Sequence, residues 1–407
     1  MASRGQSSAL RFAATCSRGT EDILAAELRR MGIHRVKEGP GVVTFMGGLQ
    51  AGYRALLWSR VASRVLLQLS RFECRDAEDL YDGVRDIPWT DHLGAAQTLA
   101  VSFVGRSKEI RHSGFGALRT KDAIVDAVRD GEGARPDIDT EDPDLRVHVH
   151  LNHAVATVSL DLSGRPLHER GEPGRRAGPA PLKETLAAAM LLHAGWPRHA
   201  RRAAALVDPM CGSGTLLVEA AGIALDRAAN LDRQRWGFSG WRGHEAAAFE
   251  AEREGAVRRW EANREHKTRI VGFDQDGRVL SHARDNARSQ GLLRAIRLER
   301  VPLGRAEPPR GAPDAPHGLL VTNPPYGERL GREDDLERLY GQLGDVLRRR
   351  FTGWTGWVLT GSRHLAGCIG LKAASRTPLW NGRIECRLLE YPVHAQAPQG
   401  RGPGWRG

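Results

Sequence analysis

The chain has 407 residues, with 60 Lys or Arg against 49 Asp or Glu and a formal net charge of +11. This length predicts two or three domains, and the basic balance favours an anionic partner such as nucleic acid. No apolar run approaches a membrane span, no secretory h-region follows Met1, and the five cysteines lack Cys-x-x-Cys spacing. We therefore expect a soluble cytoplasmic protein without a zinc site.

The first 70 residues show a small α+β pattern. Residues 1–9 are expected to be a disordered leader. Apolar periodicity predicts strands over residues 11–16, 41–45 and 61–69 and helices over residues 21–30 and 49–58. Thr20 is the expected N-cap of the first helix. This order is ferredoxin-like, and we expect residues 10–70 to form one subdomain.

The next stretch, residues 71–162, reads as a second α+β module. We expect helices over residues 79–84 and 121–129, a strand over residues 98–104, and a hairpin of residues 145–151 and 154–160. Basic side chains gather near its middle: Arg106, Lys108, Arg111, Arg119 and Lys121. Such a cluster can contact phosphate groups or can be ordinary solvated surface. His148 and His150 share one strand face, but metal ligation there is the less favoured interpretation.

Residues 163–180 are rich in Gly, Pro and Arg and predict a surface linker, because this composition cannot build a core. Residues 181–393 then alternate apolar strands with helices, which predicts an α/β domain. The Asn381-Gly382 pair predicts a closing antiparallel hairpin over residues 377–391. A polar stretch, residues 226–267, looks helical without revealing a role. Residues 394–407 are expected to be a disordered basic tail.

A glycine-rich loop follows the first apolar strand of this domain, which ends at Asp208. The loop opens a helix and contains Cys211, Gly212, Ser213, Gly214 and Thr215. Glycines let a ligand approach the backbone, and the helix start offers free N–H groups. No Lys follows the last glycine, so this is not a phosphate loop. A later strand ends at Asp274, where a carboxylate can bind ribose hydroxyls.

A third apolar strand, residues 318–322, ends at Asn323-Pro324-Pro325-Tyr326. Two prolines stop the strand abruptly, because neither can donate a backbone hydrogen bond. The Asn323 side-chain oxygen and a proline carbonyl can accept hydrogen bonds from an exocyclic amine, and Tyr326 can stack on its ring. An ordinary surface turn is the alternative interpretation of the tetrapeptide.

Together these motifs resemble the class I methyltransferases that use S-adenosylmethionine. A narrower resemblance is to the bacterial large-subunit (23S) ribosomal RNA guanine-N2 methyltransferases that carry an amino-terminal THUMP domain. The segments that support it are residues 181–188, 236–241, 323–330 and 380–385.

The resemblance implies a Rossmann-like methyltransferase domain after a ferredoxin-like and THUMP region that binds RNA. It implies that residues 208–215 and Asp274 hold the cofactor and that residues 323–326 hold the acceptor amine. It also makes Lys183 and Thr185 candidate cofactor contacts, with simple helix capping as the alternative. The chain departs from the family pattern after the third strand, where Arg300 and its neighbours replace the Asp that commonly contacts adenine.

The implied reaction is methyl transfer from S-adenosylmethionine to the N2 amine of a guanosine in large-subunit ribosomal RNA. The alternatives are a transfer-RNA guanine-N2 methyltransferase, a DNA adenine-N6 methyltransferase and a non-catalytic RNA-binding assembly factor. Cysteine-nucleophile chemistry is rejected, because Tyr326 follows the prolines and Cys211 lies in the cofactor loop. The sequence leaves the target nucleotide and the oligomeric state open.

Overall fold

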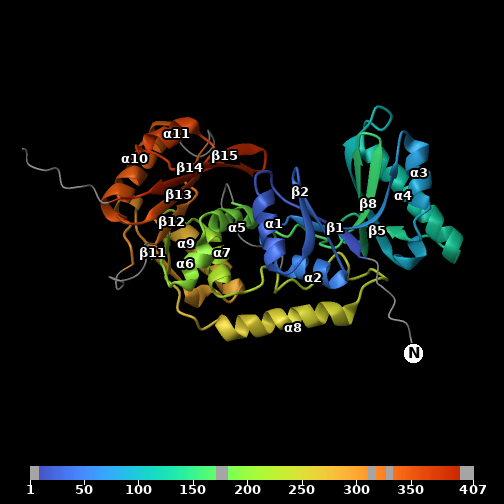
Figure 1. Cartoon of the computed structure of the whole chain (residues 1–407), viewed down its shortest axis with the longest axis horizontal. Helices are drawn as coiled ribbons and strands as arrows, with labels where there is room; N and C mark the ends of the chain where they lie inside the picture. Colours follow the sequence, from blue (N-terminus) through green and yellow to red (C-terminus); the bar gives the residue numbers. More distant parts are fainter. Residues whose placement is uncertain (1–8, 171–181, 310–317, 327–332, 395–407) are drawn as a thin grey trace, which may run out of the picture. The chain divides into compact units, whose positions relative to one another are not determined.

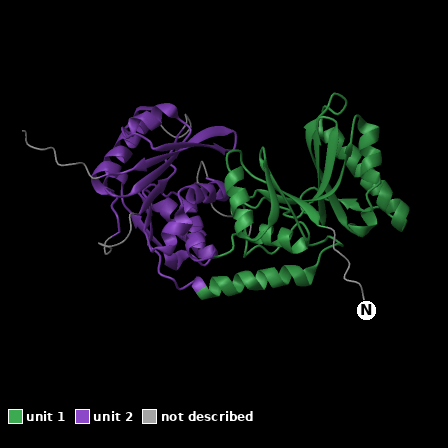
Figure 2. Cartoon of the chain, viewed as in Figure 1, with its two compact units in different colours: residues 1–173, 227–262 green, residues 174–226, 263–407 purple. Residues whose placement is uncertain are grey.

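The computed structural model describes residues 9–170, 182–309, 318–326 and 333–394 (Figure 1). The chain folds into two compact units (Figure 2). Unit 1 contains residues 1–173 and 227–262, and unit 2 contains residues 174–226 and 263–407. Each unit is built on one β-sheet. None of the described helices is long and apolar enough to cross a membrane.

Unit 1 holds an eight-stranded sheet in the order β2-β3-β1-β4-β8-β7-β5-β6. Its first half contains β1 (Leu10–Thr15), α1 (Glu21–Arg30), β2 (His34–Gly39), β3 (Val42–Gly47), α2 (Leu49–Trp58) and β4 (Arg64–Glu73). Its second half contains α3 (Ala77–Arg85), the 3-10 turn η1 (Trp89–Asp91), β5 (Thr98–Arg106), α4 (Ser113–Glu132), β6 (Asp137–Ile138), β7 (Leu145–Asn152) and β8 (Val155–Asp161). Antiparallel pairing of β4 with β8 makes the two halves one continuous sheet.

A buried carboxylate fixes the join between these halves. Asp161, at the end of β8, is 2% exposed and forms an ion pair with Arg64 at the start of β4. Its other oxygen accepts a hydrogen bond from the Ser163 backbone N–H at 3.0 Å. A buried carboxylate needs such partners, because burial otherwise disfavours its charged form. Asp161 therefore holds the two halves in one register.

Glycines let the helices of unit 1 lie close to the sheet. A Cβ atom on Gly52, Gly83 or Gly116 would come within 2.4–2.7 Å of a phenylalanine ring below it. The three rings belong to Phe12, Phe72 and Phe103. The contact between Gly116 and Phe103 explains why the predicted start of α4 is wrong. The helix begins at Ser113 instead of residue 121. Poor helix formers fill its first turns because the close approach to Phe103 requires Gly116.

One strand of unit 1 was missed, and the N-cap position of α1 was predicted correctly. The edge strand β2 was not predicted, because its sequence His-Arg-Val-Lys-Glu-Gly is mostly exposed and has no apolar alternation. Thr20 lies at the N-cap position of α1 but makes no side-chain cap. Its hydroxyl instead donates to the Ser17 carbonyl at 2.7 Å.

The polar stretch after residue 226 belongs to unit 1 and is only partly helical. It turns through residues 227–245 and then forms α8 (Ala246–Asn263). Its buried Arg233 donates to the carbonyls of Ser163 and Arg165 at 3.0 and 2.8 Å. Leu167 is fully buried and Arg170 is 2% exposed. The expectation of a surface linker is therefore wrong for residues 163–170, and residues 171–181 lie outside the described residues.

Unit 2 holds a seven-stranded sheet in the order β11-β10-β9-β12-β13-β15-β14. Its strands are β9 (Leu206–Asp208), β10 (Ile270–Asp274), β11 (Ile296–Arg300), β12 (Leu319–Thr322), β13 (Thr355–Thr360), β14 (Ser375–Asn381) and β15 (Ile384–Pro392). Its helices are α5 (Glu184–His193), α6 (Trp196–Arg201), α7 (Thr215–Ala224), α9 (Gly277–Ser289), α10 (Glu333–Arg350) and α11 (Arg363–Cys368), with 3-10 turns η2 (Leu293–Ala295) and η3 (Leu303–Arg305). Strands β11, β10, β9, β12 and β13 run parallel, and β15 and β14 close the sheet as the predicted antiparallel hairpin.

Candidate active site

The three polar strand ends predicted from sequence meet at one edge of the unit 2 sheet. Strand β9 lies between β10 and β12, and both neighbours run parallel to it. The carboxyl ends of the three strands therefore place Asp208, Asp274 and Asn323 side by side. Ligands of open α/β sheets bind outside this edge.

Asp208 and Thr322 link the predicted cofactor side of this edge to the predicted acceptor side. The Thr322 hydroxyl donates to Asp208 Oδ1 at 2.8 Å, and the Met210 backbone N–H donates to the same oxygen at 3.2 Å. Asp208 is 1% exposed, and burial raises its pKa to about 7 against the lowering effect of these two hydrogen bonds. The negative charge of Asp274 raises the pKa of Asp208 further. Asp208 thus bridges β9 and β12, and its carboxyl group has a pKa above that of an ordinary aspartate.

The glycine loop is tied to the end of β10. The Gly212 backbone N–H donates to Asp274 Oδ2 at 3.0 Å, and the Asp276 N–H donates to Oδ1 at 3.0 Å. Gly212 has a φ of +53°, and a Cβ atom there would meet nothing within 4 Å. The loop therefore leaves open space beside a fixed carboxylate, where a ligand can approach the backbone closely.

The rest of the loop packs against α9 of the same unit. Gly214 has a φ of +79° and lies so close to Ala283 of α9 that a Cβ would be 3.0 Å from the Ala283 methyl. Asn286 of α9 donates to the Ser213 carbonyl at 3.0 Å, and Thr215 begins α7. Burial raises the pKa of the Cys211 thiol well above its usual range. Such a thiol is a poor nucleophile, in keeping with the rejection of cysteine chemistry.

Lys183 and Thr185 lie at the start of α5, which packs against α7. Lys183 occupies the N-cap position without a side-chain cap and is exposed, whereas Thr185 is 3% exposed. Within the described ranges, no hydrogen bond joins either side chain to residues 208–215. Their assignment to the cofactor stays a prediction.

The acceptor motif presents a buried oxygen that lacks a partner. Asn323 follows the fully buried strand β12, and its Oδ1 atom is buried with no hydrogen-bond partner among the described residues. An unpaired buried acceptor costs roughly 1–3 kcal/mol. Such a group in a native structure calls for an explanation, for example a catalytic role or a bound water or ion. Pro324 is buried and Pro325 half-buried beside it, so the oxygen is held at a rigid strand end.

Tyr326 is fixed by the hairpin of β14 and β15. Asn381 Nδ2 donates to the Tyr326 hydroxyl at 2.9 Å, and the Cys386 thiol donates to it at 3.4 Å. A Cβ atom on Gly361 would lie 3.0 Å from the tyrosine ring, so the ring rests on bare backbone. Burial and the Cys386 contact raise the pKa of Tyr326, which therefore stays neutral. Sequence reasoning missed Asn381 as a site residue, because the Asn-Gly pair predicted only a turn.

The predicted RNA-binding residues fall into two groups. Arg106, Lys108 and Arg111 are exposed around the turn between β5 and α4. Arg119 instead lies 4.1 Å from the Tyr81 ring centroid and pairs with Glu78 at 2.6 Å. Lys121 pairs with Asp122 at 2.5 Å. Their role in RNA binding stays a prediction, and the first group is better placed to contact phosphate.

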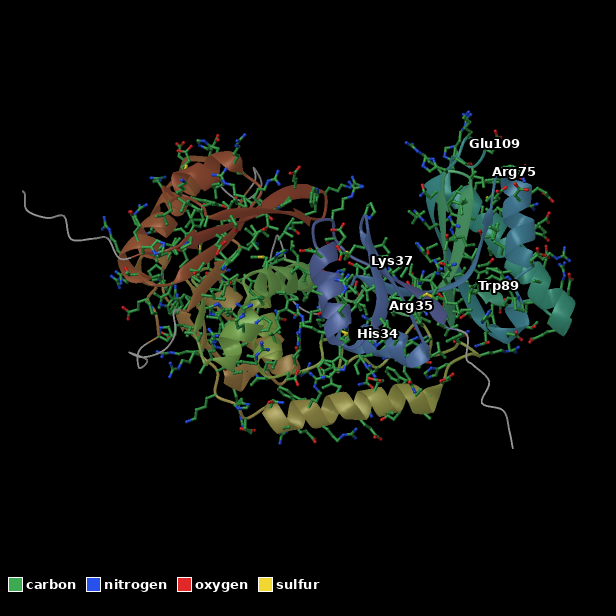
Figure 3. The ribbon with its side chains drawn as sticks, in the orientation of Figure 1. His34, Arg35, Lys37, Arg75, Trp89 and Glu109 are labelled. Carbon is green, nitrogen blue, oxygen red and sulfur yellow. The ribbon has the colours of Figure 1, made fainter. Side chains whose placement is uncertain are left out.

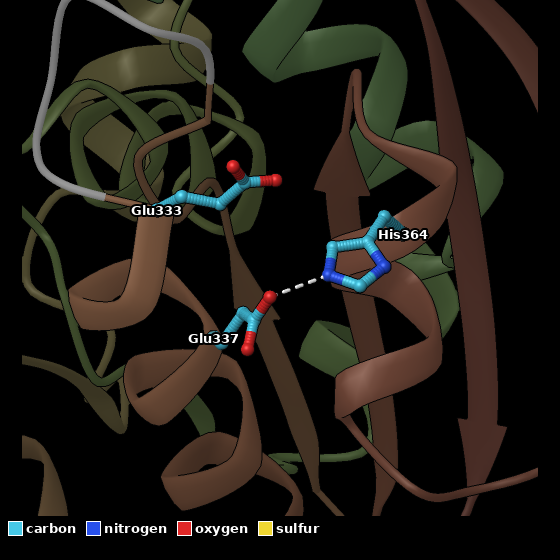
Figure 4. A group of neighbouring side chains, drawn as sticks. All are labelled: Glu333, Glu337 and His364. Carbon is cyan, nitrogen blue, oxygen red and sulfur yellow. Dashed lines mark hydrogen bonds and ion pairs between the residues drawn. The ribbon is translucent and has the colours of Figure 1, made fainter.

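One group of side chains in unit 2 has the spacing of metal ligands. Ligand atoms of Glu333, Glu337 and His364 lie within 4.8 Å of one another (Figure 4). His364 Nε2 and Glu337 Oε1 are 2.6 Å apart, and this hydrogen bond raises the pKa of His364. Exposed acidic groups commonly gather without an ion, and the hydrogen bond accounts for the closest pair. His148 is instead hydrogen-bonded to Ser102 through Nδ1 at 3.0 Å.

Comparison with protein families covers most of the chain. The model described as "RMKL-like, methyltransferase domain" matches residues 173–390. The THUMP domain matches residues 74–161, and the RlmL ferredoxin-like domain matches residues 11–66. The predicted THUMP module and methyltransferase domain are confirmed, and so is the predicted α/β class with a ferredoxin-like start.

Individual relatives agree with this result. A curated protein of Syntrophotalea carbinolica named "Ribosomal RNA large subunit methyltransferase K/L" is 48% identical over 95% of this chain. The match covers 54% of that protein, so the chain spans about half the length of the curated relatives it matches. The crystal structure of SMU.472, "a putative methyltransferase complexed with SAH", covers 96% of this chain and 99% of its own at 28% identity and a TM-score of 0.83.

A second solved structure carries a different name. It is "a predicted N6-adenine-specific DNA methylase" from Listeria monocytogenes, 29% identical with a TM-score of 0.82. It covers 95% of this chain and 96% of its own. The fold is thus shared with a protein whose name assigns adenine in DNA as the acceptor, whereas the names of the curated relatives assign ribosomal RNA without a base.

Proposed function

Because the chain belongs to the RMKL-like methyltransferase family, we propose that it methylates the exocyclic N2 amine of a guanosine in large-subunit ribosomal RNA. The name of its curated relatives supports ribosomal RNA as the substrate. The N2 position is not part of those names and rests on the acceptor site and on the resemblance of residues 323–330. Of these, residues 327–330 lie outside the described part of the chain. If the substrate is ribosomal RNA, we expect the protein to act in the cytoplasm.

The residues at the sheet edge fit S-adenosylmethionine as the cofactor. Asp274 would accept hydrogen bonds from the ribose hydroxyls, because each of its oxygens has a lone pair beyond those used by Gly212 and Asp276. The open space at Gly212 and the start of α7 suit the methionine part. SMU.472, with S-adenosylhomocysteine bound, supports this choice of cofactor. When bound, the cofactor supplies an electrophilic methyl group.

The single observation that carries the acceptor assignment is the unpaired Asn323 Oδ1. An exocyclic NH2 group would donate one hydrogen bond to this oxygen and one to a proline carbonyl of the same motif. Both acceptors would favour a pyramidal nitrogen as positive charge develops on it. Because β12 and the prolines fix these acceptors, the geometry is preorganised before the substrate arrives.

Tyr326 would hold the base once it has left its stack. The Asn381 and Cys386 contacts and the Gly361 backbone fix its ring before substrate binds. A fixed ring loses little conformational freedom on stacking, so more of the stacking energy is available for base extrusion. RNA in place of DNA is favoured by the THUMP match in the same chain.

A second candidate is methylation of another exocyclic amine, since Asn323 can accept a hydrogen bond from adenine N6 as well as from guanine N2. The name of the Listeria monocytogenes protein supports adenine. A transfer-RNA guanine-N2 enzyme and a non-catalytic RNA-binding factor would share this architecture. Each of these candidates predicts a different modified product.

The test is to incubate purified full-length chain with tritiated S-adenosylmethionine and protein-free large-subunit RNA from cells lacking the gene. We expect label in N2-methylguanosine after nuclease digestion and chromatography, and much less label with RNA from wild-type cells. Label in transfer RNA or in N6-methyladenine would replace the proposal with the corresponding candidate. No label in any RNA or DNA, with intact cofactor binding, would favour the non-catalytic factor.

A further inference from the structure

The turn between β5 and α4 concentrates positive charge that is not neutralised by ion pairs. No ion pair is formed by Arg106, Lys108 or Arg111 within the described residues, and Glu109 is the one acidic side chain of the turn. Figure 3 labels Glu109 on this turn. Several other basic side chains of the same module are paired, as in Arg85 with Asp130 and Arg129 with Asp126. The free charge of the turn therefore attracts an anion.

Large apolar side chains lie next to this charge and face solvent. Phe115 is 49% exposed and Leu118 is 59% exposed, at positions i and i+3 on one face of α4. The buried positions Gly116, Thr120 and Ala123 lie on the other face of the helix. An exposed aromatic ring within a polar surface is informative, because burial of such rings is otherwise strongly favoured. Folding of the module does not account for this exposure.

The charged turn leads directly into the apolar face of α4, and we call the two together the tip surface: Arg106, Lys108, Arg111, Phe115 and Leu118. Ile110 is fully buried and anchors the turn, and the Ser107 hydroxyl accepts its backbone N–H at 3.0 Å. Arg111 Nε donates to the Lys108 carbonyl at 2.9 Å. Gly116 lies against the Phe103 ring of β5, which packs the first turn of α4 against that strand.

Phosphate positioning alone needs only the basic side chains of this surface. Duplex RNA offers phosphates and 2′-hydroxyls on its outside, whereas its bases are stacked and cannot reach an aromatic ring. Unpaired nucleotides offer a phosphate and a free base face together, and aromatic rings between basic side chains are the usual platform for them. An acidic protein partner would satisfy the charge, but its carboxylates would not cover the exposed Phe115 ring.

We propose that the tip surface binds unpaired nucleotides of the RNA substrate, with a base stacked on Phe115, its sugar and neighbouring base against Leu118, and phosphates on Arg106, Lys108 and Arg111. The inference rests on the proposed action on RNA and adds that the amino-terminal half selects a loop, bulge or single-stranded end. The start of α4 supports it, because no side chain caps this 20-residue helix and its first turn has no acidic residue.

The test compares two RNAs that carry the same number of phosphates, a hairpin with a single-stranded extension and a fully paired duplex. Full-length wild-type chain and variants are titrated against each RNA by fluorescence anisotropy. We expect wild type to prefer the extended hairpin, and Phe115→Ala to weaken that complex roughly ten-fold or more, as for the loss of one base–aromatic stack. Duplex affinity should change less than about two-fold, because no base stacks on Phe115 there.

Three further variants make the result specific. Phe115→Tyr keeps an aromatic ring and should retain wild-type affinity, whereas Arg111→Glu should weaken both complexes and flatten their salt dependence. Ile138→Ala removes an apolar side chain of the same unit that is 47% exposed on β6, outside the tip surface, and should change nothing. Thermal unfolding would confirm that each variant is folded.

The outcomes separate this inference from the proposed function. Equal wild-type affinity for the two RNAs, or a Phe115→Ala effect no larger than that of Ile138→Ala, would overturn the inference while leaving methyl transfer to RNA intact. Equal losses on both RNAs from Phe115→Ala would also overturn it, because stacking on a free base could not then be the cause. Failure of wild type to bind or methylate any RNA would instead refute the proposed function.

Discussion

Asn323 provides a prediction in which activity and stability move in opposite directions. Its Oδ1 atom is buried without a partner in the described part of the unbound chain, and such an acceptor costs roughly 1–3 kcal/mol of folding free energy. Asn323→Leu, which replaces the amide with an apolar group of similar shape, should therefore leave the free energy of unfolding unchanged or raise it. Turnover should fall about 10²- to 10³-fold, as for loss of one preorganised contact to developing charge.

The assay pairs urea unfolding of the unbound protein with single-turnover methyl transfer and calorimetry of cofactor binding. Cofactor affinity should stay within about two-fold of wild type, because the contact proposed for Asn323 is with the acceptor amine. Thr322→Val is the matched control one residue away. It removes the hydroxyl that donates to buried Asp208 and should lower the free energy of unfolding by about 1–3 kcal/mol. Near-wild-type turnover in Asn323→Leu would refute the acceptor role. If Asn323→Leu lowered the free energy of unfolding as much as Thr322→Val does, the claim that the Asn323 oxygen lacks a hydrogen-bond partner would be wrong.

Three further predictions follow from other contacts. In the unbound protein the pKa of Asp208 is raised to about 7, above the unfolded value of about 4, so the folded state binds the extra proton between these pH values. The free energy of unfolding should fall as pH rises across that interval, and Asp208→Asn should remove this fall in urea unfolding curves measured from pH 4 to 8. Asn381→Ala should lower single-turnover methyl transfer without changing cofactor affinity, because it frees the Tyr326 hydroxyl; a wild-type rate would contradict the positioning role. A fragment of residues 1–170 should unfold at lower urea concentration than unit 1 of the full chain, because it lacks the Arg233 contacts to residues 163 and 165; equal midpoints by circular dichroism would show that those contacts add nothing.

The sequence predicted where three polar motifs lie on the unit 2 sheet, because each one ends or follows a short, mostly apolar strand. Asp208, Asp274 and Asn323 all lie where the apolar runs end, and parallel strands bring such ends together without further information. The hairpin around Gly382 was predicted for the same local reason, since turn chemistry is readable from two residues. These features depend on periodicity and on backbone conformation, and both are determined by residues that are close together in the sequence.

The missed features depend on contacts between distant segments. The role of Asn381 appears only when β14 folds back to Tyr326, and the start of α4 depends on Phe103 lying under Gly116. The packing of residues 163–170 depends on Arg233, which is separated from them by the glycine-loop helix in the sequence. A Gly-, Pro- and Arg-rich composition predicts a linker because it cannot supply its own core. Here the segment that carries Arg233 supplies that core. No local pattern in residues 163–170 reveals which segment packs against them.

The discontinuous make-up of unit 1 bears on the order in which the chain can mature during synthesis. Residues 227–262 complete unit 1, yet residues 174–226 of unit 2 are made before them. The nascent amino-terminal half therefore lacks the hydrogen bonds of Asn230 to the Leu56 and Ser59 carbonyls until the segment 227–262 has left the ribosome. For the same reason, exchanging a whole unit between two homologues requires crossovers near residues 173, 226 and 262. A single crossover would pair the first half of one parent with the completing segment of the other.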